Sequence, residues 1–291
     1  MGTHATNSKL SVEISRALVL NTGGTIGMAL NPEHPEHGLA PVKNRFVKVC
    51  QSHPSLNDEN FRKRLLKAGK LQDKFLILPE RLDGGKRRVA YHIEEYSELI
   101  DSSNFTVKNW QKLCRDIRDN YESYNGFVIL HGTDTMVYTA SALSFMLVNL
   151  NKTVILTGSQ KPIFENRTDG LSNLVSSLLI AGLKVVPEVS ILTFNRLLRG
   201  NRCIKRSTEE FFCFDTCNLL PLMTLGVKTH VNDCLIMPQA KKKFYAHIAM
   251  NENVSLLRIF PGISSRAINA ALGEPYQGIV LHTYGAGKRP H

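Results

Sequence analysis

The chain has 291 residues, enough for one large domain or two smaller ones with a substantial core. Hydrophobic residues make up 43% and charged residues 21%, a balance typical of a globular chain that excludes a fibrous or disordered one. The formal net charge is +11, but the excess lysines and arginines lie in scattered patches without a nucleic-acid-binding motif. We therefore expect no nucleic acid as a partner.

The start of the chain is polar and has no apolar segment of the signal-peptide kind. We expect residues 1–15 to be disordered. No apolar run reaches the roughly 18 residues that a membrane-spanning helix needs, so we expect no membrane partner.

Six cysteines are scattered through a chain that is too large to need disulfides. This favours reduced thiols and a cytoplasmic location. Cys213 and Cys217, with His230 and Cys234 downstream, could be imagined as a zinc site, but they lack the usual two-residue spacing. We expect no metal and no organic cofactor.

Short apolar runs alternate with segments of helical spacing over the first 230 residues. Strands are expected at residues 17–20, 75–78, 127–130, 153–156 and 189–194. Helices are expected around three apolar stripes: Trp110, Leu113, Ile117 and Tyr121; Ala140, Leu143, Met146 and Leu147; and Leu171, Leu174, Leu178 and Leu179. This alternation predicts an α/β domain with buried, mainly parallel strands over residues 16–228.

The pattern loosens after this domain. Residues 229–252 are predicted to be a linker around Lys241-Lys242-Lys243. Periodicity then resumes as a strand at 255–259, a helix at 261–272 and a strand at 278–281. These elements are too few for an independent core, and we expect residues 253–291 to form an incomplete smaller α/β domain.

Two threonine-bearing turns follow expected strands. Thr22-Gly23-Gly24-Thr25 follows residues 17–20, and His131-Gly132-Thr133-Asp134-Thr135 follows residues 127–130. Ligands of open α/β sheets bind at the carboxyl ends of strands, so both turns should deliver hydroxyls to one crevice. Such turns are also common for steric reasons alone. A nucleophilic threonine with a second hydroxyl and a carboxylate nearby suggests hydrolysis through a covalent threonine ester.

Three further segments accompany these turns in order: Asp101-Ser102-Ser103, Thr157-Gly158-Ser159-Gln160 and Arg199-Gly200-Asn201-Arg202. Together the five motifs resemble the type I, cytosolic-type L-asparaginases, with a match from about residue 16 to about residue 287. The resemblance implies a flavodoxin-like N-terminal domain, a smaller C-terminal α/β domain that is apparently truncated here, and assembly into homodimers or homotetramers.

The resemblance also implies roles for individual residues. Thr25 would attack the side-chain amide of L-asparagine and form the acyl ester. Thr133, Asp134 and Lys205 would form the second catalytic group, in which a lysine must be neutral to act as a base. Asp101, Ser102 and Ser103, with Thr133 and Asp134, would bind the substrate. Asp101-Ser102-Ser103 alone also fits a helix N-cap, and it can serve both purposes.

The sequence departs from the family pattern at three places. Leu39, at the end of the loop that starts at Asn31, stands where bacterial members carry a tyrosine. Lys288 replaces the asparagine of a turn that reaches a neighbouring subunit. Ile204 occupies a threonine position tied to allosteric asparagine binding, so we carry over no regulation.

The sequence thus predicts an asparaginase, an amidohydrolase that yields L-aspartate and ammonia. One alternative is a weak or inactive homologue that binds amino acids or acts as an oligomer partner. A lesser alternative is a lysophospholipase-like hydrolase, although these residues supply no lipid-binding groove.

Overall fold

The computed structural model describes residues 12–30, 38–80 and 85–289, which separate into two compact units at the boundary between Ile248 and Ala249. Within the described residues of the first unit, the main sheet has nine strands in the order β14-β13-β10-β9-β8-β6-β1-β5-β4. Its strands are β1 (Glu13–Gly23), β4 (Leu76–Ile77), β5 (Arg87–Ile100), β6 (Gly126–Leu130), β8 (Thr153–Thr157), β9 (Val189–Thr193), β10 (Arg196–Arg199), β13 (Met223–Leu225) and β14 (Thr229–Val231).

Five of these strands are parallel, and their order is that of a flavodoxin-like sheet. Taken in chain order as first to fifth, β1, β5, β6, β8 and β9 lie side by side as 2-1-3-4-5. Ala17 of β1 faces Tyr91 of β5 on one side and Gly126 of β6 on the other. The predicted fold class is therefore confirmed. Successive strands are added on one side of β1 up to β5 and on its other side from β6 onward. Sheets of this kind bind ligands at the point where the strand order reverses, here between β1 and β6.

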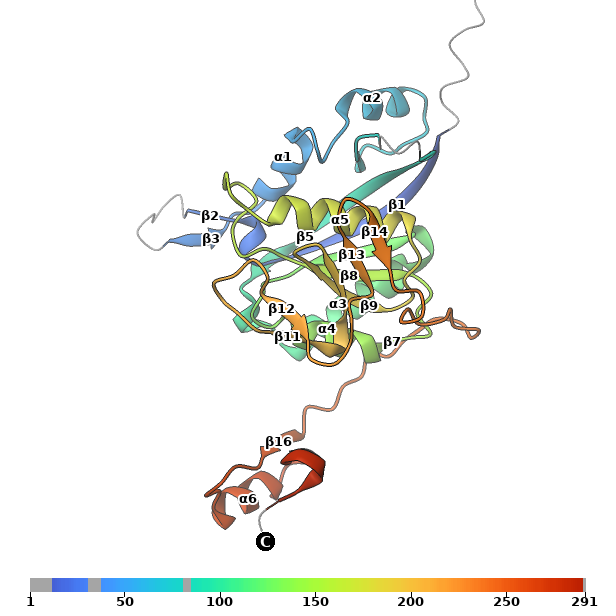
Figure 1. Cartoon of the computed structure of the whole chain (residues 1–291). Coiled ribbons are helices and arrows are strands. Elements are labelled where there is room, and N and C mark those ends of the chain that lie inside the picture. Colours follow the sequence, from blue (N-terminus) through green and yellow to red (C-terminus); the bar gives the residue numbers. More distant parts are fainter. Residues whose placement is uncertain (1–11, 31–37, 81–84, 290–291) are drawn as a thin grey trace, which may run out of the picture. The chain divides into compact units, whose positions relative to one another are not determined.

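Helices cover both faces of the sheet. Figure 1 shows α5 (Gly170–Leu183) along one face and α3 (Val107–Asn120) and α4 (Met136–Met146) along the other. The central strands are consequently largely apolar and buried, and residues 17–20 have no exposed surface. The three helices predicted from apolar stripes are confirmed.

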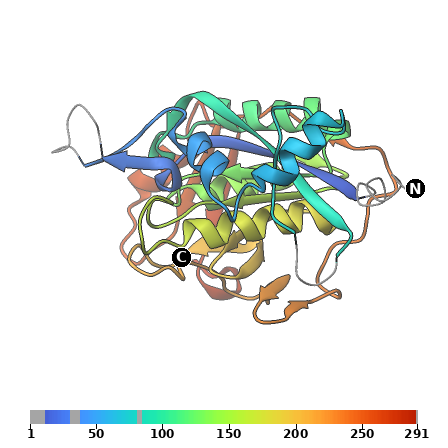
Figure 2. The ribbon, with the colours of Figure 1, turned by 90° about the horizontal axis from the view of Figure 1, so that it is seen from above.

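The segment between β1 and β5 adds a hairpin and two helices to the first unit and ends in β4 of the main sheet. A hairpin of β2 (Met28–Leu30) and β3 (Leu39–Pro41) projects to one side in Figure 2, drawn in blue. It is followed by α1 (Arg45–Ser52) and α2 (Glu59–Lys67). Asp58 caps α2 by accepting a hydrogen bond from Phe61 N and also pairs with the buried Arg88 of β5.

The structure differs from the expected linker at residues 229–252. β14 pairs with β13 at the edge of the main sheet, and β15 (Tyr245–Ala246) pairs with β7 (Leu147–Val148) behind α4. The first unit therefore runs to Ile248, because these short strands satisfy their backbone groups on it. At the other end, Glu13 to Ser15 belong to β1 rather than to a disordered start, and residues 1–11 lie outside the described residues.

The second unit comprises β16 (Val254–Arg258), α6 (Ser265–Leu272) and β17 (Gly278–His282), which agree with the predicted strand, helix and strand. β16 and β17 pair in parallel, and Ser264 caps α6 through Ala267 N. Leu257 and Ile259 are buried, whereas Leu256, Val280 and Leu281 are exposed. This unit thus has little core of its own.

Candidate active site

The turn after β1 is fixed by contacts of its backbone. Thr22 Oγ1 donates to Leu130 O at 2.7 Å, which ties the ends of β1 and β6 together. Gly24 has a φ of 85°, and a Cβ added there would lie 2.4 Å from Gly132 N. Only glycine allows this approach. The two threonine-bearing turns therefore touch, and the partly exposed Thr25 opens a short 3-10 helix, Thr25–Gly27, beside the Thr133 turn.

The turn after β6 carries the best-defined polar contacts of the site. Lys205 Nζ lies 2.8 Å from Thr133 Oγ1 and 2.6 Å from Asp134 Oδ1. The side chain of Lys205 is 13% exposed and that of Asp134 is 62% exposed, so the ion pair lies at the mouth of the site. Lys205 thus joins a hydroxyl and a carboxylate that lie 72 and 71 residues earlier in the chain, respectively.

Lys205 reaches this position on a small hairpin. It ends β11 (Cys203–Lys205), which pairs with β12 (Phe214–Thr216) so that Lys205 faces Phe214. A 3-10 helix at Gly200–Arg202, packed on α4, connects β10 to this hairpin. The motif Arg199-Gly200-Asn201-Arg202 therefore forms the arm, the short connection that places Lys205 alongside α4.

The Asp101-Ser102-Ser103 segment adjoins both turns. Ser102 is buried, its carbonyl accepts a hydrogen bond from Thr135 Oγ1 at 2.7 Å, and a Cβ on Gly132 would lie 2.6 Å from its side chain. Asp101 Oδ1 accepts from Ser103 N and from Ser103 Oγ, both at 2.9 Å. Asp101 therefore caps the 3-10 helix Ser102–Asn104.

The next helix does not use Asp101 as its cap. Asn109 Oδ1 accepts from Thr106 N at 2.7 Å and closes the first turn of α3. The three segments that bear Thr25, Ser102 and Thr133 pack together. Lys205 contacts the Thr133 segment.

Asp169 is a residue that the sequence analysis did not single out, and it stabilises a loop next to the site. Asp169, just before α5, accepts hydrogen bonds from Gln160 N at 3.0 Å and from Asn173 Nδ2 at 3.2 Å. Burial raises the pKa of this carboxyl, against the hydrogen bonds that lower it. The braced loop reaches the first threonine turn through Ile163 N, which donates to Ile26 O at 3.0 Å. The available signal was an aspartate immediately before a glycine-started helix.

The departures from the family pattern fall at different places. Leu39 is 45% exposed in β3, and residues 31–37 of its loop lie outside the described residues. Ile204 is 47% exposed next to Lys205. Lys288 follows the short 3-10 helix Gly285–Gly287 in the second unit, and its carbonyl accepts from Tyr284 N at 3.0 Å.

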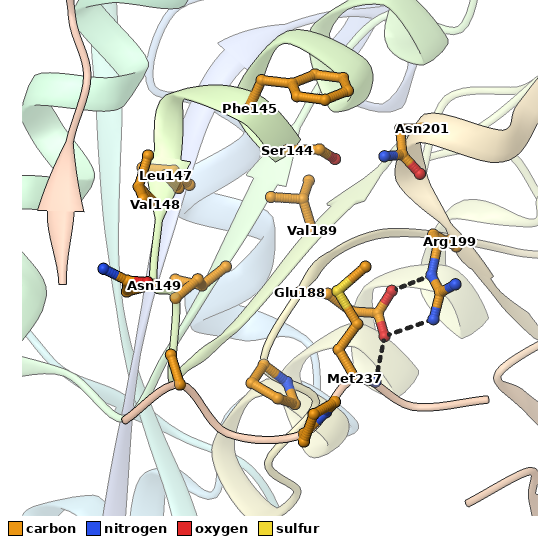
Figure 3. A pocket seen from close by; sticks show the side chains of 14 residues that line it. Ser144, Phe145, Leu147, Val148, Asn149, Glu188, Val189, Arg199, Asn201 and Met237 are labelled. Atoms are coloured by element: carbon orange, nitrogen blue, oxygen red, sulfur yellow. Dashed lines mark hydrogen bonds and ion pairs between the residues drawn. The ribbon is translucent and has the colours of Figure 1, made fainter. Parts of the chain in front are cut away.

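A cavity of about 370 Å³ lies at the far end of α4, and neither Thr25, Thr133 nor Lys205 lines it. Figure 3 shows Glu188 and Arg199 on one side of it and Leu147 and Val148 on the other. Arg199 Nε lies 2.6 Å from Glu188 Oε2, and Arg199 also donates to Leu235 O. Since its guanidinium is bound here, Arg199 is not a free charge beside Lys205.

The described parts of the chain offer neither a set of metal ligands nor a membrane-spanning helix. No group of three or more histidine, cysteine, aspartate or glutamate side chains there could hold a metal ion. No described helix has both the length and the apolar character that crossing a bilayer requires.

Residues 16–236 match the family model described as "Asparaginase, N-terminal". The chain belongs to the asparaginase family. The matched region contains all the predicted site residues, from Thr25 to Lys205, and it covers the nine-stranded sheet apart from the start of β1.

Three similar proteins carry the names L-asparaginase and lysophospholipase. The chain is 39% identical over 282 residues to an L-asparaginase of Dirofilaria immitis, covering 97% of this chain and 47% of that protein. It is 40% identical over 276 residues to the human 60 kDa lysophospholipase, covering 94% and 46%. It is 37% identical over 272 residues to L-asparaginase 1 of Escherichia coli, covering 94% and 71%.

Among solved structures, L-asparaginase I from Vibrio cholerae aligns with a TM-score of 0.76 at 34% identity, covering 95% of this chain and 74% of that one. The chain spans about half the length of the Dirofilaria and human relatives. Membership of the asparaginase family is thus shown over nearly the whole chain.

Proposed function

We propose that the protein hydrolyses the side-chain amide of L-asparagine to L-aspartate and ammonia. The observation that carries the proposal is the contact of Lys205 Nζ with Thr133 Oγ1 at 2.8 Å and with Asp134 Oδ1 at 2.6 Å. This group lies beside the Thr25 turn, at the point of the sheet where ligands bind. Family membership and the relatives named L-asparaginase support the same reaction.

The proposed chemistry proceeds in two halves. Thr25 Oγ1 attacks the amide carbon and loses its proton to a basic group of the site, which passes this proton to the nitrogen, so that the C–N bond breaks and ammonia leaves. Water then attacks the ester carbon, the bond from that carbon to Thr25 Oγ1 breaks, and a proton of the water goes to Thr25 Oγ1 as L-aspartate is released. In the second half, Thr133 Oγ1 and Lys205 Nζ are the groups that activate this water.

The substrate's own charged groups have partners in the same place. The Asp134 carboxylate is exposed enough to bind the α-ammonium group of L-asparagine while it also pairs with Lys205. Asp101 and Ser103 lie at the surface next to the buried Ser102 and supply oxygens and a hydroxyl for the backbone end of the substrate. Hydrogen bonds in which one partner is charged are stronger than those between neutral groups.

The test replaces the two hydroxyls separately. Thr25→Ala and Thr133→Ala should each lower ammonia release from L-asparagine by at least about a thousandfold, because removal of one member of a nucleophile–base set removes the function of the whole set. Thr229→Ala changes an exposed threonine of β14 and is the matched control. Ammonia release that survives in both site variants would reject the proposed nucleophile and relay.

The same samples distinguish the alternatives. Heat of L-asparagine binding without ammonia production identifies an inactive binding protein. Release of fatty acid from a lysophospholipid that is lost in Thr25→Ala identifies a lysophospholipase-like hydrolase, as the name of the human relative suggests.

We also propose that the protein works in the cytoplasm without a metal or organic cofactor, and as a homodimer or homotetramer where its C-terminal lobe is complete. Light scattering after gel filtration measures the assembly. Activity that survives treatment with a chelator is expected, since the proposed steps use only side chains and water.

A further inference from the structure

A buried chain of polar groups lies behind the Thr133 turn. Trp110 Nε1 is 2.9 Å from Thr139 Oγ1, and Thr139 Oγ1 is 2.8 Å from His131 Nε2. His131 Nδ1 is 2.7 Å from Gly132 O. His131 and Thr139 have no exposed surface, and the ring of Phe105 packs on His131 with a centroid distance of 4.3 Å.

The direction of each hydrogen bond in this chain follows from the chemistry of its ends. An indole N–H can only donate and a carbonyl oxygen can only accept. His131 must therefore donate to Gly132 O through a protonated Nδ1. Burial lowers the pKa of His131 to about 4, so the ring is neutral near pH 7 and Nε2 accepts. The Thr139 hydroxyl accepts from Trp110 and donates to His131.

The last acceptor of these hydrogen bonds, Gly132 O, belongs to the peptide group that joins Gly132 to Thr133. His131 O and Gly132 N are held on both sides, because a Cβ on Gly158 would lie 2.4 Å from the first and a Cβ on Gly24 would lie 2.4 Å from the second. A hydrogen bond to Gly132 O fixes the plane of the next peptide, to which Thr133 N belongs. The orientation of Thr133 toward Lys205 therefore depends on the His131 ring.

We propose that His131, oriented by Thr139 and Trp110, is a positioning residue that sets the Thr133 hydroxyl for the reaction. The inference rests on the proposed function for its catalytic consequence. The hydrogen-bond directions themselves are properties of the fold and can be measured without turnover.

The kinetic test removes the middle hydroxyl at nearly constant volume. Thr139→Val should lower kcat for L-asparagine about tenfold with KM within about twofold, since small misplacements of a reacting group are costly while substrate contacts remain. Thr139→Ser keeps the hydroxyl and should restore kcat. Thr153→Val, which removes a buried threonine hydroxyl bonded to Lys184 O, is the matched control and should leave kcat unchanged.

The structural test uses two spectroscopic signals. Nitrogen NMR should show His131 of the wild type with a protonated Nδ1 and a bare Nε2 at pH 7. Trp110 is the only tryptophan of the chain, so its fluorescence should shift in Thr139→Val and not in Thr139→Ser. If Thr139→Val does not fold, Trp110→Phe, which removes the first donor, takes its place with the same expected fall in kcat.

The outcomes separate the two proposals. A charged His131 ring or a protonated Nε2 at pH 7 overturns the positioning role, and so does wild-type kcat in a folded Thr139→Val protein. A wild-type protein that releases no ammonia from L-asparagine, with the predicted NMR signals intact, refutes the proposed function while leaving the hydrogen-bond chain standing.

Discussion

Gly24 shows how one missing side chain brings the candidate site together. It lets the Thr25 turn lie against the backbone of Gly132, where a Cβ would be 2.4 Å from Gly132 N, and it holds a φ of 85° that L residues rarely adopt. Two separate effects, a steric overlap and a strained backbone, therefore resist any substitution here.

Gly24→Ala should lower the free energy of unfolding by more than the roughly 1–3 kcal/mol of backbone strain alone, because the overlap with Gly132 adds to it. Urea denaturation measures the change. Gly69→Ala is the control, since Gly69 also has a positive φ, of 64°, but nothing within 4 Å of where its Cβ would lie. Equal losses in the two variants would show that the contact with Gly132 is unimportant.

His131 makes stability depend on pH. Its ordinary pKa of 6.5 is lowered to about 4 by burial, so between these values the unfolded chain binds a proton that the folded chain does not. Stability therefore rises with pH across this window. From pH 7 to pH 4 the folded state should lose up to about 3 kcal/mol from this residue.

The measurement is urea denaturation at several pH values in wild type and His131→Gln. The variant should have a flatter profile between pH 4 and 6.5, whatever its stability at pH 7. Parallel profiles would mean that the folded protein protonates His131 as readily as the unfolded chain does.

At the scale of the element, the arm that carries Lys205 is anchored at its start. Arg199, at the end of β10, is held by Glu188 at 2.6 Å, and Glu188 Oε1 also accepts from Met237 N at 3.1 Å. The two side chains are 16% and 5% exposed, so removal of one partner leaves the other largely buried without its counter-ion.

Glu188→Ala should therefore lower the free energy of unfolding by about 3 kcal/mol, as expected when a buried ion pair is broken. It should also lower activity through displacement of Lys205. Asp119→Ala, which breaks the exposed pair with Arg118, is the control and should leave the unfolding midpoint in place. A midpoint shift of the same size in both variants would contradict this account.

The sequence predicted those elements whose apolar residues follow one clear period. The strand at 127–130 and the helix around Leu113 and Ile117 are buried on the faces that their spacing predicted. β5 escaped notice although it pairs with β1 along its length, because Glu94 and Glu95 interrupt its apolar run. Three-residue strands such as β14 carry too few side chains to show a period.

The candidate site was predictable from its motifs only in part. Glycine turns after apolar runs pointed to Thr25 and Thr133, and the family resemblance alone drew attention to Lys205. The links among His131, Thr139 and Trp110 join segments 8 to 29 residues apart through side chains, which no local spacing reveals. Sequence patterns place elements, whereas contacts between elements require coordinates.

On the scale of the whole molecule, the first unit carries both the nine-stranded sheet and the predicted site residues. The second unit buries few of its apolar side chains, with Leu256 at 67% and Val280 at 57% exposure. Large exposed apolar side chains favour association.

A chain that ends at Ile248 should therefore unfold cooperatively with a Tm within a few degrees of the full chain, because the core of the first unit stays intact. Calorimetry measures both. The full chain should bind more of an apolar dye than the shortened one. A shortened chain that fails to fold would show that the first unit depends on residues 249–291.

β1 lies between β6 and β5 inside the sheet yet is made before either of them. Ala17 pairs with Tyr91 on one side and Gly126 on the other, so during synthesis the apolar residues 17–20 wait about 5–20 s until both neighbours exist, at the usual rate of elongation. During that interval the nascent polypeptide exposes an apolar segment whose backbone pairing is incomplete. Its yield in a host should accordingly depend on how well the ribosome-associated chaperones shield residues 17–20.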